Sequence, residues 1–178
     1  MENQTTILNQ EGTIIDNDIE EQKIISLWRF IFLSVISLGA YEIWWMYKAW
    51  RFYQQKDKSD INPVARAIFS IFFINSLLGK ILSFAKEKGY SENYSSAGLA
   101  TGFIVINLLS SLPDPFWVIS ILSFLFLIPA FTAFNFAKLN SNDFQVKEQD
   151  SFNGRQIALI VIGAILWFII IIGLIEGE

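Results

Sequence analysis

Five long apolar segments constrain this chain more than any other feature of its sequence. Residues 95–112, 115–137 and 156–175 contain no charged side chain, while residues 24–46 and 64–84 contain two each. About 20 helical residues cross the hydrocarbon core of a bilayer. In lipid the backbone must satisfy its own hydrogen bonds, and no segment alternates as barrel strands do. The sequence therefore predicts an all-α, polytopic helical membrane protein with four to five transmembrane segments.

Composition agrees with this class and excludes most catalytic chemistry. Of the 178 residues, 53% are hydrophobic and 17% are charged, against about 25% charged in a typical soluble domain. The chain has no cysteine and no histidine, which excludes disulfides, thiolate or imidazole metal sites, and Cys-His or Ser-His catalysis. Phosphate-binding loops and zinc-protease motifs are also missing from the sequence. We expect no enzymatic activity, no catalytic residue, no cofactor and no metal.

Charge is concentrated at the start of the chain. Residues 1–23 hold six acidic residues and only one base, whereas the remaining residues are nearly balanced. This predicts an acidic, poorly ordered tail at 1–23 ahead of a membrane domain at 24–175, and a docking segment for a basic partner is the alternative. The bases form no concentrated basic footprint, so a nucleic-acid partner is not expected.

Basic residues beside the first apolar segment predict its orientation. Only Lys23 precedes the segment, whereas four bases follow it: Lys48, Arg51, Lys56 and Lys58. The positive-inside rule then places residues 47–63 in the cytoplasm and the N-terminus outside. With that orientation, counts of Lys and Arg favour four spans with a re-entrant or short hairpin segment at 95–112, and five full spans are the alternative.

A turn with two prolines separates the third and fourth apolar segments. Pro113 and Pro115 restrict the residues before them to extended conformations, which ends the preceding helix. Asp114 is a favourable N-cap and Pro115 suits a first helical position. The sequence predicts a tight hairpin between residues 95–112 and 115–137.

Several motifs together resemble a group of uncharacterised bacterial inner-membrane proteins with about four spans. The motifs are SLG at 37–39, YEIWWMYKAW at 41–50, INP at 61–63, RAIF at 66–69 and LPDPFW at 112–117, with Asn135 and Asn140. The resemblance covers roughly residues 24–175. It implies bacterial origin and a multi-pass location in the cell inner membrane, and it carries no known activity.

Charged residues inside the apolar segments are the first candidate sites. Glu42 and Arg66 come to similar depth if the first two segments are antiparallel, which predicts an intramembrane ion pair. The pair would fix helix register, or alternatively bind an ion or an anionic lipid. Arg29 and Lys80 are expected to anchor the opposite membrane face by snorkelling.

Polar and aromatic residues supply two further candidates. Polar intramembrane side chains either line a permeation path or hold helices together, and a polar seam is predicted from Asn75, Asn107, Asn135 and Asn140. A belt of interfacial anchors is predicted from Trp44, Trp45, Tyr47, Lys48, Trp50 and Arg51. An aromatic cage for a cationic ligand is the alternative function of this belt.

Two classes of function follow from these features. The first is a small integral membrane protein that acts by associating with membrane lipids, with a membrane-protein partner or with further copies of itself. The second is a small transporter or channel that uses the polar seam between helices. The absence of catalytic residue types favours the first.

Overall fold

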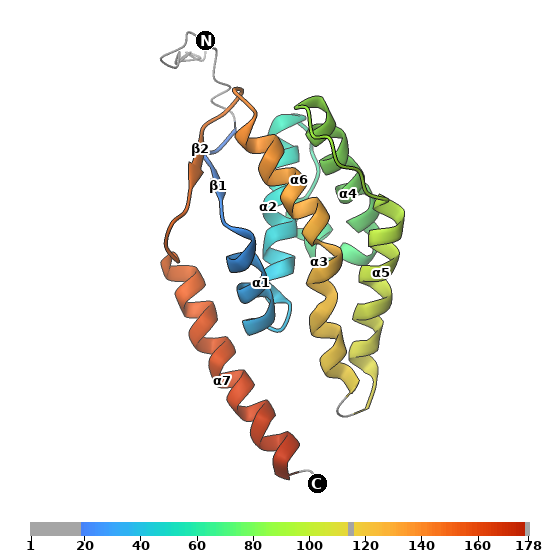
Figure 1. The fold of residues 1–178 in the computed structure, drawn as a ribbon, viewed down its shortest axis with the longest axis vertical. Helices are drawn as coiled ribbons and strands as arrows, with labels where there is room; N and C mark the ends of the chain where they lie inside the picture. The colour runs from blue at the N-terminus through green and yellow to red at the C-terminus, as the bar shows by residue number, and fades with distance from the viewer. Residues whose placement is uncertain (1–18, 114–115, 177–178) are drawn as a thin grey trace.

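The computed structural model describes residues 19–113 and 116–176, which form a helical bundle with one two-stranded ribbon (Figure 1). The expected all-α class is confirmed, apart from this ribbon. In chain order the elements are β1 (Gln22–Ile24), α1 (Leu27–Ile36), α2 (Ala40–Lys56), α3 (Pro63–Ile68), α4 (Ser70–Glu87), α5 (Ser96–Leu108), the 3-10 helices η1 (Leu109–Ser111) and η2 (Phe116–Phe126), α6 (Ile128–Leu139), β2 (Val146–Glu148) and α7 (Gly154–Glu176).

The first predicted span is broken into two helices. Leu38 and Gly39 both adopt positive φ, at 53° and 88°, and this reverses the chain between α1 and α2. Glycine adopts such a conformation without steric cost, and the Ser37 hydroxyl accepts a 2.9 Å hydrogen bond from the Tyr41 amide at the start of α2. Residues 24–46 therefore comprise the last residue of β1, the ten-residue helix α1 and the start of α2, and not one continuous helix.

The second predicted span is also interrupted. Asn62 caps α3 by accepting a 3.1 Å hydrogen bond from the Ala65 amide, with Pro63 at the first turn. Phe69, with ψ of 39°, separates α3 from α4. The segment 64–84 is thus a short helix followed by a longer one, and this junction exposes the large apolar side chains of Ile68, Phe69 and Phe72.

The third and fourth segments form a tight hairpin. Ser95 caps helix α5, because its hydroxyl accepts a 3.1 Å hydrogen bond from the Gly98 amide, and η2 packs back along this helix. A Cβ atom at Gly102 would collide with the Phe126 ring, so the two arms approach closely at this glycine. Within residues 95–112 the chain runs through α5 and η1 to the turn without reversing, so the reversal needs the following η2, and how this hairpin lies in a membrane stays a prediction. Asp114 and Pro115 lie outside the described residues.

Two helical stretches in the described part of the chain are long and apolar enough to cross a membrane. These are Phe116–Leu139, which comprises η2 and α6, and Gly154–Ile175 in α7. They differ sharply in environment, because 39% of the most apolar window is buried in the first and 6% in the second. The sequence predicted four to five transmembrane segments, and those beyond these two helical stretches stay predictions.

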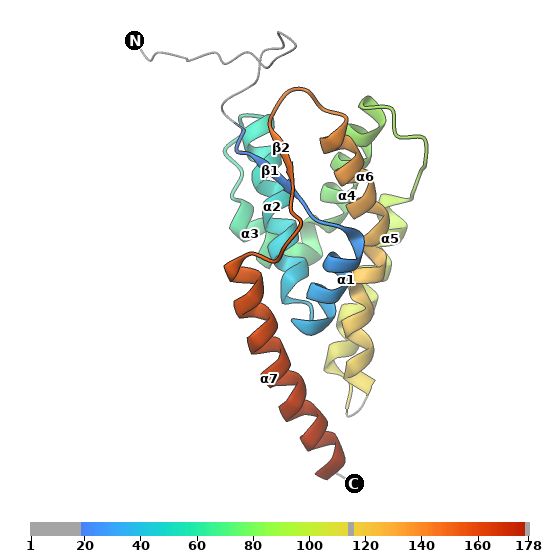
Figure 2. The same ribbon diagram turned by 60° about the vertical axis from the view of Figure 1, so that its left-hand side comes forward.

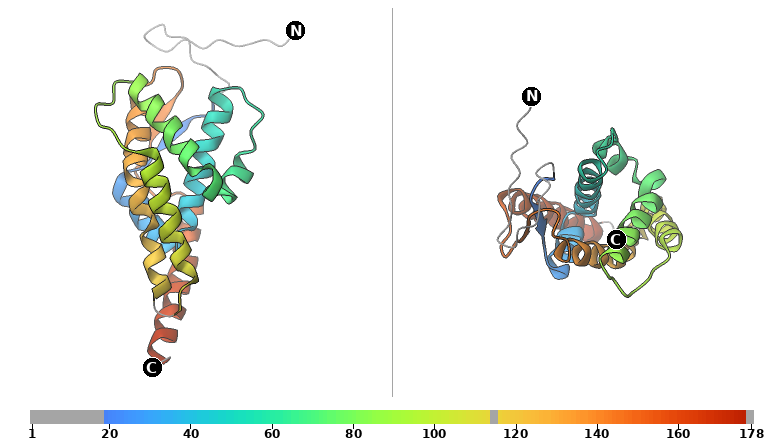
Figure 3. Two further views of the ribbon diagram at one scale, coloured as in Figure 1. Left: turned by 90° about the vertical axis from the view of Figure 1, so that its right-hand side faces the viewer. Right: turned by 90° about the horizontal axis from the view of Figure 1, so that it is seen from above.

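Polar connections gather at one end of the molecule. Strands β1 and β2 pair in parallel there, and the C-terminal ends of α2, α4 and α6 lie at the same end of the molecule (Figures 1 and 2). The α5–η2 hairpin and α7 extend toward the opposite end (Figure 3). The prediction that the residues before α1 and those after α2 lie on opposite sides is wrong, because the turn at 37–39 returns α2 to the end from which α1 started.

An aromatic core holds the polar half together. Phe30 of α1 stacks on Phe131 of α6 with ring centroids 4.4 Å apart. Phe52 of α2 contacts both Phe134 and Phe144 edge-on, at 5.3 Å and 5.2 Å. These buried rings join elements distant in sequence and fix α2, α6 and the ribbon around the site described next.

Candidate functional site

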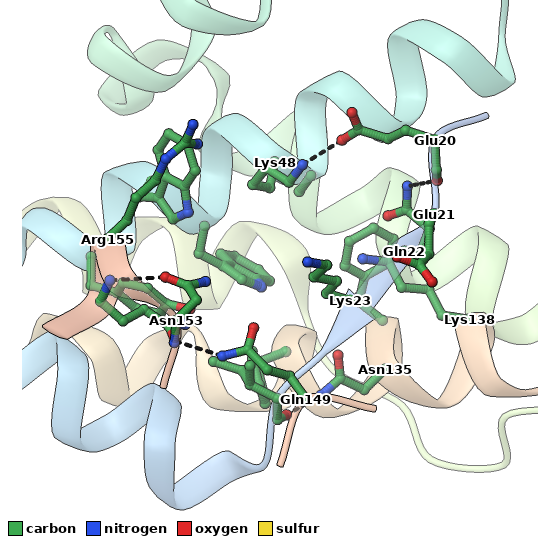
Figure 4. Close-up of a pocket in the computed structure, with 18 of the residues that line it drawn as sticks. Glu20, Glu21, Gln22, Lys23, Lys48, Asn135, Lys138, Gln149, Asn153 and Arg155 are labelled. Atoms are coloured by element: carbon green, nitrogen blue, oxygen red, sulfur yellow. Dashed lines mark hydrogen bonds and ion pairs between the residues drawn. The ribbon is translucent and has the colours of Figure 1, made fainter. Parts of the chain in front are cut away.

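A cavity of about 550 Å³ lies between the ribbon, α2, α6 and the start of α7 (Figure 4). Its size falls within the range of small-molecule sites. The polar residues that line it are Glu20, Glu21, Gln22, Lys23, Lys48, Asn135, Lys138, Gln149, Asn153, Arg155 and Gln156. The remaining wall is mostly apolar and aromatic, from Ile25, Ala40, Tyr41, Trp44, Trp45, Ala49, Phe131, Phe134 and Leu159.

Bases outnumber acids around the cavity. Four bases and two acids line it, and Glu20 is already engaged. The Glu20 carboxylate pairs with the Lys48 ammonium and, at 3.0 Å, with the Arg51 guanidinium. Among the described residues, no carboxylate pairs with Lys23, Lys138 or Arg155, so the cavity presents an excess of positive charge.

Lys138 is the most unusual of these bases. It lies on the last turn of α6, its exposed fraction is 6%, and its Nζ sits 3.9 Å from the centre of the Phe134 ring and 5.6 Å from that of Phe52. Figure 4 shows Lys138 and Lys23 pointing toward the middle of the cavity. Aromatic faces attract a cation but supply no hydrogen-bond acceptor comparable to a carboxylate or phosphate.

Amide side chains organise the side of the cavity at α7. Gln156 accepts hydrogen bonds from the Gln149 side chain at 2.6 Å and from the Asn153 backbone at 3.0 Å. Its own side-chain amide donates to the Tyr41 hydroxyl at 3.4 Å. Through these contacts Gln156 ties the linker after β2 and the first turn of α7 to α2.

The predicted Glu42–Arg66 ion pair is wrong. Buried Glu42 accepts hydrogen bonds from the Ser123 hydroxyl of η2, at 3.0 Å and 2.9 Å to its two oxygens. The Arg66 guanidinium stacks 4.4 Å above the Trp50 ring. Trp50 is eight residues, or about 12 Å, farther along α2 than Glu42, so Arg66 on α3 contacts a different level of that helix.

Arg29 and Lys80 do not mark an opposite face. The Arg29 guanidinium donates to the backbone carbonyls of Gln149 and Asp150, beside the ribbon. Lys80 pairs with Asp57, at the C-terminal end of α2, with 2.6 Å between Nζ and Oδ2. Both bases lie in the polar half because α1 and α4 do not cross to the far end as the predicted spans would.

The four asparagines are not brought together into one seam. Asn135 lines the cavity and donates to the Ile25 carbonyl at 3.1 Å. Asn107 and Asn140 each donate to a carbonyl one turn earlier in their own helices, and Asn75 is exposed on α4. Asn135 alone of the four lines the cavity, so the four asparagines do not share this cavity, and a permeation path between helices stays a prediction.

The predicted aromatic belt divides between core and surface. Trp45 and Trp50 are buried, whereas Trp44 is exposed and packs against Tyr47 with ring centroids 5.2 Å apart. Lys48 and Arg51 bind Glu20. The predicted belt therefore contributes side chains to the helical core as well as to the surface, because α2 packs along its length against other helices.

Comparisons of the chain with protein-family models, with characterised proteins and with solved structures gave no match. The resemblance to uncharacterised bacterial inner-membrane proteins therefore remains a prediction. The residues missed by sequence reasoning were Lys23, Lys138 and Arg155, which come together only through the β1–β2 pairing. Each of these bases flanks an apolar segment, and in the sequence such bases predicted only which side of the membrane a loop faces.

Proposed function

We propose that this chain is an integral membrane protein that acts by associating with lipids and not by chemistry. In this proposal α7 crosses the bilayer, while the α5–η2–α6 hairpin and the α1–α2 turn enter it from the side of the ribbon. The protein would thus be multi-pass or partly re-entrant, with most of its polar mass on one side of the membrane.

The observation that carries the proposal is the outward surface of α7. The 22 residues Gly154–Ile175 extend about 33 Å, enough for a hydrocarbon core of about 30 Å. Large apolar side chains along it are open to the surroundings, such as Ile162, Phe168 and Ile175, which are 56%, 66% and 70% exposed. A soluble monomer rarely exposes a continuous apolar surface of this extent, whereas lipid would cover it.

The distribution of bases supports one orientation. All thirteen Lys and Arg residues fall in or near the polar half, and residues 30–47, 89–137 and 156–178 contain none. By the positive-inside rule this half faces the cytoplasm, which agrees with a bacterial inner-membrane location. It also places the basic residues where they meet anionic headgroups, with each base near the surface contributing about 1 kcal/mol to membrane attraction.

Alkaline extraction of membranes tests this proposal. We expect the full chain to stay in the membrane pellet at high pH and to float with vesicles. Phe168→Arg should reduce insertion, because Arg at the centre of a spanning helix costs about 2.5–3.5 kcal/mol, and Asn142→Arg in an exposed loop should not. Release of the wild-type chain into the supernatant would overturn the proposal.

A further inference from the structure

We infer that the cavity between the ribbon, α2, α6 and α7 binds an anionic phosphate headgroup, with the attached acyl chain passing between α2 and the start of α7. The inference rests on the proposed function, because a lipid ligand requires that the cavity lie at the membrane surface. It adds to that function a specific site, a ligand class and the residues that recognise it.

Charge around the cavity selects an anion. Lys23, Lys138 and Arg155 have no carboxylate partner among the described residues, and Glu20 is held by Lys48 and Arg51. Lys138 is buried, and burying a cation without a counterion is costly. A phosphate placed between Lys23 and Lys138 would accept charge-assisted hydrogen bonds from both.

Apolar walls of the cavity select an amphiphile over a free ion. Trp44 and Trp45 of α2 and Leu159 of α7 line the cavity beside the bases. Trp45 already packs against the rings of Phe30 and Phe131, but Trp44 is 42% exposed. An acyl chain would cover this exposed part of Trp44, whereas an inorganic phosphate would not. Leu159 belongs to the same apolar helix that would meet lipid, so a chain leaving the cavity there enters the hydrocarbon directly.

The position of the cavity along α7 corresponds to the level of the lipid headgroups in the proposed orientation. Arg155 and Asn153 line it, and they stand at the point where the charge-free segment of α7 begins. That point would coincide with the membrane surface if α7 spans the bilayer. Lipid phosphates lie at this level, so the ligand needs no extraction from the membrane to reach the site.

The ribbon provides a matched pair of lysines for the test. Lys23 of β1 and Lys147 of β2 are register partners, and both are exposed. Lys23 lines the cavity, whereas Lys147 does not. Exchange of either exposed lysine for glutamine changes the net charge equally and leaves the core intact, so a difference between the two variants reports on the cavity.

Thermal shifts in delipidated detergent solution test the inference. We expect phosphatidylglycerol to raise the Tm of the full chain more than phosphatidylcholine does. The apparent affinity for phosphatidylglycerol should fall about tenfold in Lys23→Gln and in Lys138→Gln, because each variant loses one charge-assisted hydrogen bond to the phosphate. The affinity should stay unchanged in Lys147→Gln. Lys138→Gln removes a buried group, so Lys23→Gln keeps the test valid if the former fails to fold.

Other outcomes separate the sources of the phosphate and the two proposals. Equal weakening in Lys23→Gln and Lys147→Gln would overturn the inference in favour of general surface attraction. A shift with glycerol phosphate matching that with the lipid would replace the lipid by a soluble phosphate ester. If the chain resists alkaline extraction but neither lysine variant changes lipid affinity, the site fails while the membrane location stands.

Discussion

The two long apolar helical stretches look alike in sequence and have different surroundings. Phe116–Leu139 packs within the bundle, and its polar side chains have internal contacts, as where Ser123 donates to Glu42. Gly154–Ile175 contacts mainly α1 and presents aliphatic side chains outward. The length of an apolar segment therefore predicts a helix in a nonpolar environment. Polar residues within the segment indicate whether other parts of the protein supply some of that environment.

The largest expected effect concerns how α7 joins the rest of the molecule. A side chain at Gly163 would collide with the Ile36 carbonyl, whereas Gly173 on the same helix has open space around it. We expect Gly163→Leu to separate α7 from α1 and to destabilise the protein by about 1–3 kcal/mol or more. Gly173→Leu is the matched control and should leave the Tm in detergent nearly unchanged. Equal Tm values for the two variants would contradict the close crossing.

The second effect tests the internal packing of the hairpin. Ser123→Ala removes the hydroxyl that donates to both oxygens of buried Glu42, and we expect a loss of about 1–3 kcal/mol in unfolding free energy. Ser120→Ala, which removes a bond only to the Trp117 carbonyl of its own helix, should cost less. Denaturation of both variants in the same detergent measures the difference, and an equal loss would mean that the Glu42 contact is unimportant.

A smaller effect distinguishes the observed surroundings of Arg66 from the predicted ion pair. Arg66→Gln removes the stacking on Trp50, worth about 0.5–2 kcal/mol. The double exchange Glu42→Arg with Arg66→Glu should be more destabilising than either single exchange, because it both buries a guanidinium beside Ser123 and removes the Arg66 contact with Trp50, and the two new side chains do not meet. Recovery of the wild-type Tm in the double variant would instead support the predicted ion pair between positions 42 and 66.

The smallest effect lies at the exposed polar end. Lys88 donates to Asp143 at 2.8 Å, and this hydrogen bond lowers the pKa of the Asp143 carboxyl. Its stabilising contribution is therefore present above the unfolded-state pKa and is lost as pH falls through the lowered value. Because the Asp143 side chain is 54% exposed, the change should stay below about 1 kcal/mol. Unfolding curves at several acidic pH values should show a shallower decline for Asp143→Asn than for wild type.

Local signals in the sequence were sufficient for some elements of the fold. The Leu112–Pro113 turn predicted the hairpin, because proline restricts the residue before it regardless of context. The five apolar segments correctly indicated helices. Their lengths did not reveal the breaks at Gly39 and Phe69, since an apolar run reads the same whether it continues or turns back.

The cavity could not be predicted for a different reason. Its bases come from β1, α2, α6 and α7, and they meet because Gln22–Ile24 pairs with Val146–Glu148 across more than 120 residues. Three-residue strands carry no recognisable alternation, so this long-range pairing leaves no local pattern. Glu42 was singled out correctly as a buried charge, but its partner Ser123 is a neutral residue without any distinguishing spacing.

Sided labelling of single cysteines tests the central claim, that the polar loops share one side of the membrane, most directly. The chain has no cysteine, so Asp60→Cys, Asn93→Cys and Asn142→Cys each place one thiol in an exposed loop, and Ile175→Cys places one at the far end of α7. We predict that an impermeant reagent reaches the three loop positions from the cytoplasmic side only, and Ile175→Cys from the opposite side only. Labelling of Asp60→Cys and Asn93→Cys from opposite sides would contradict the account and restore a second span that crosses fully between them.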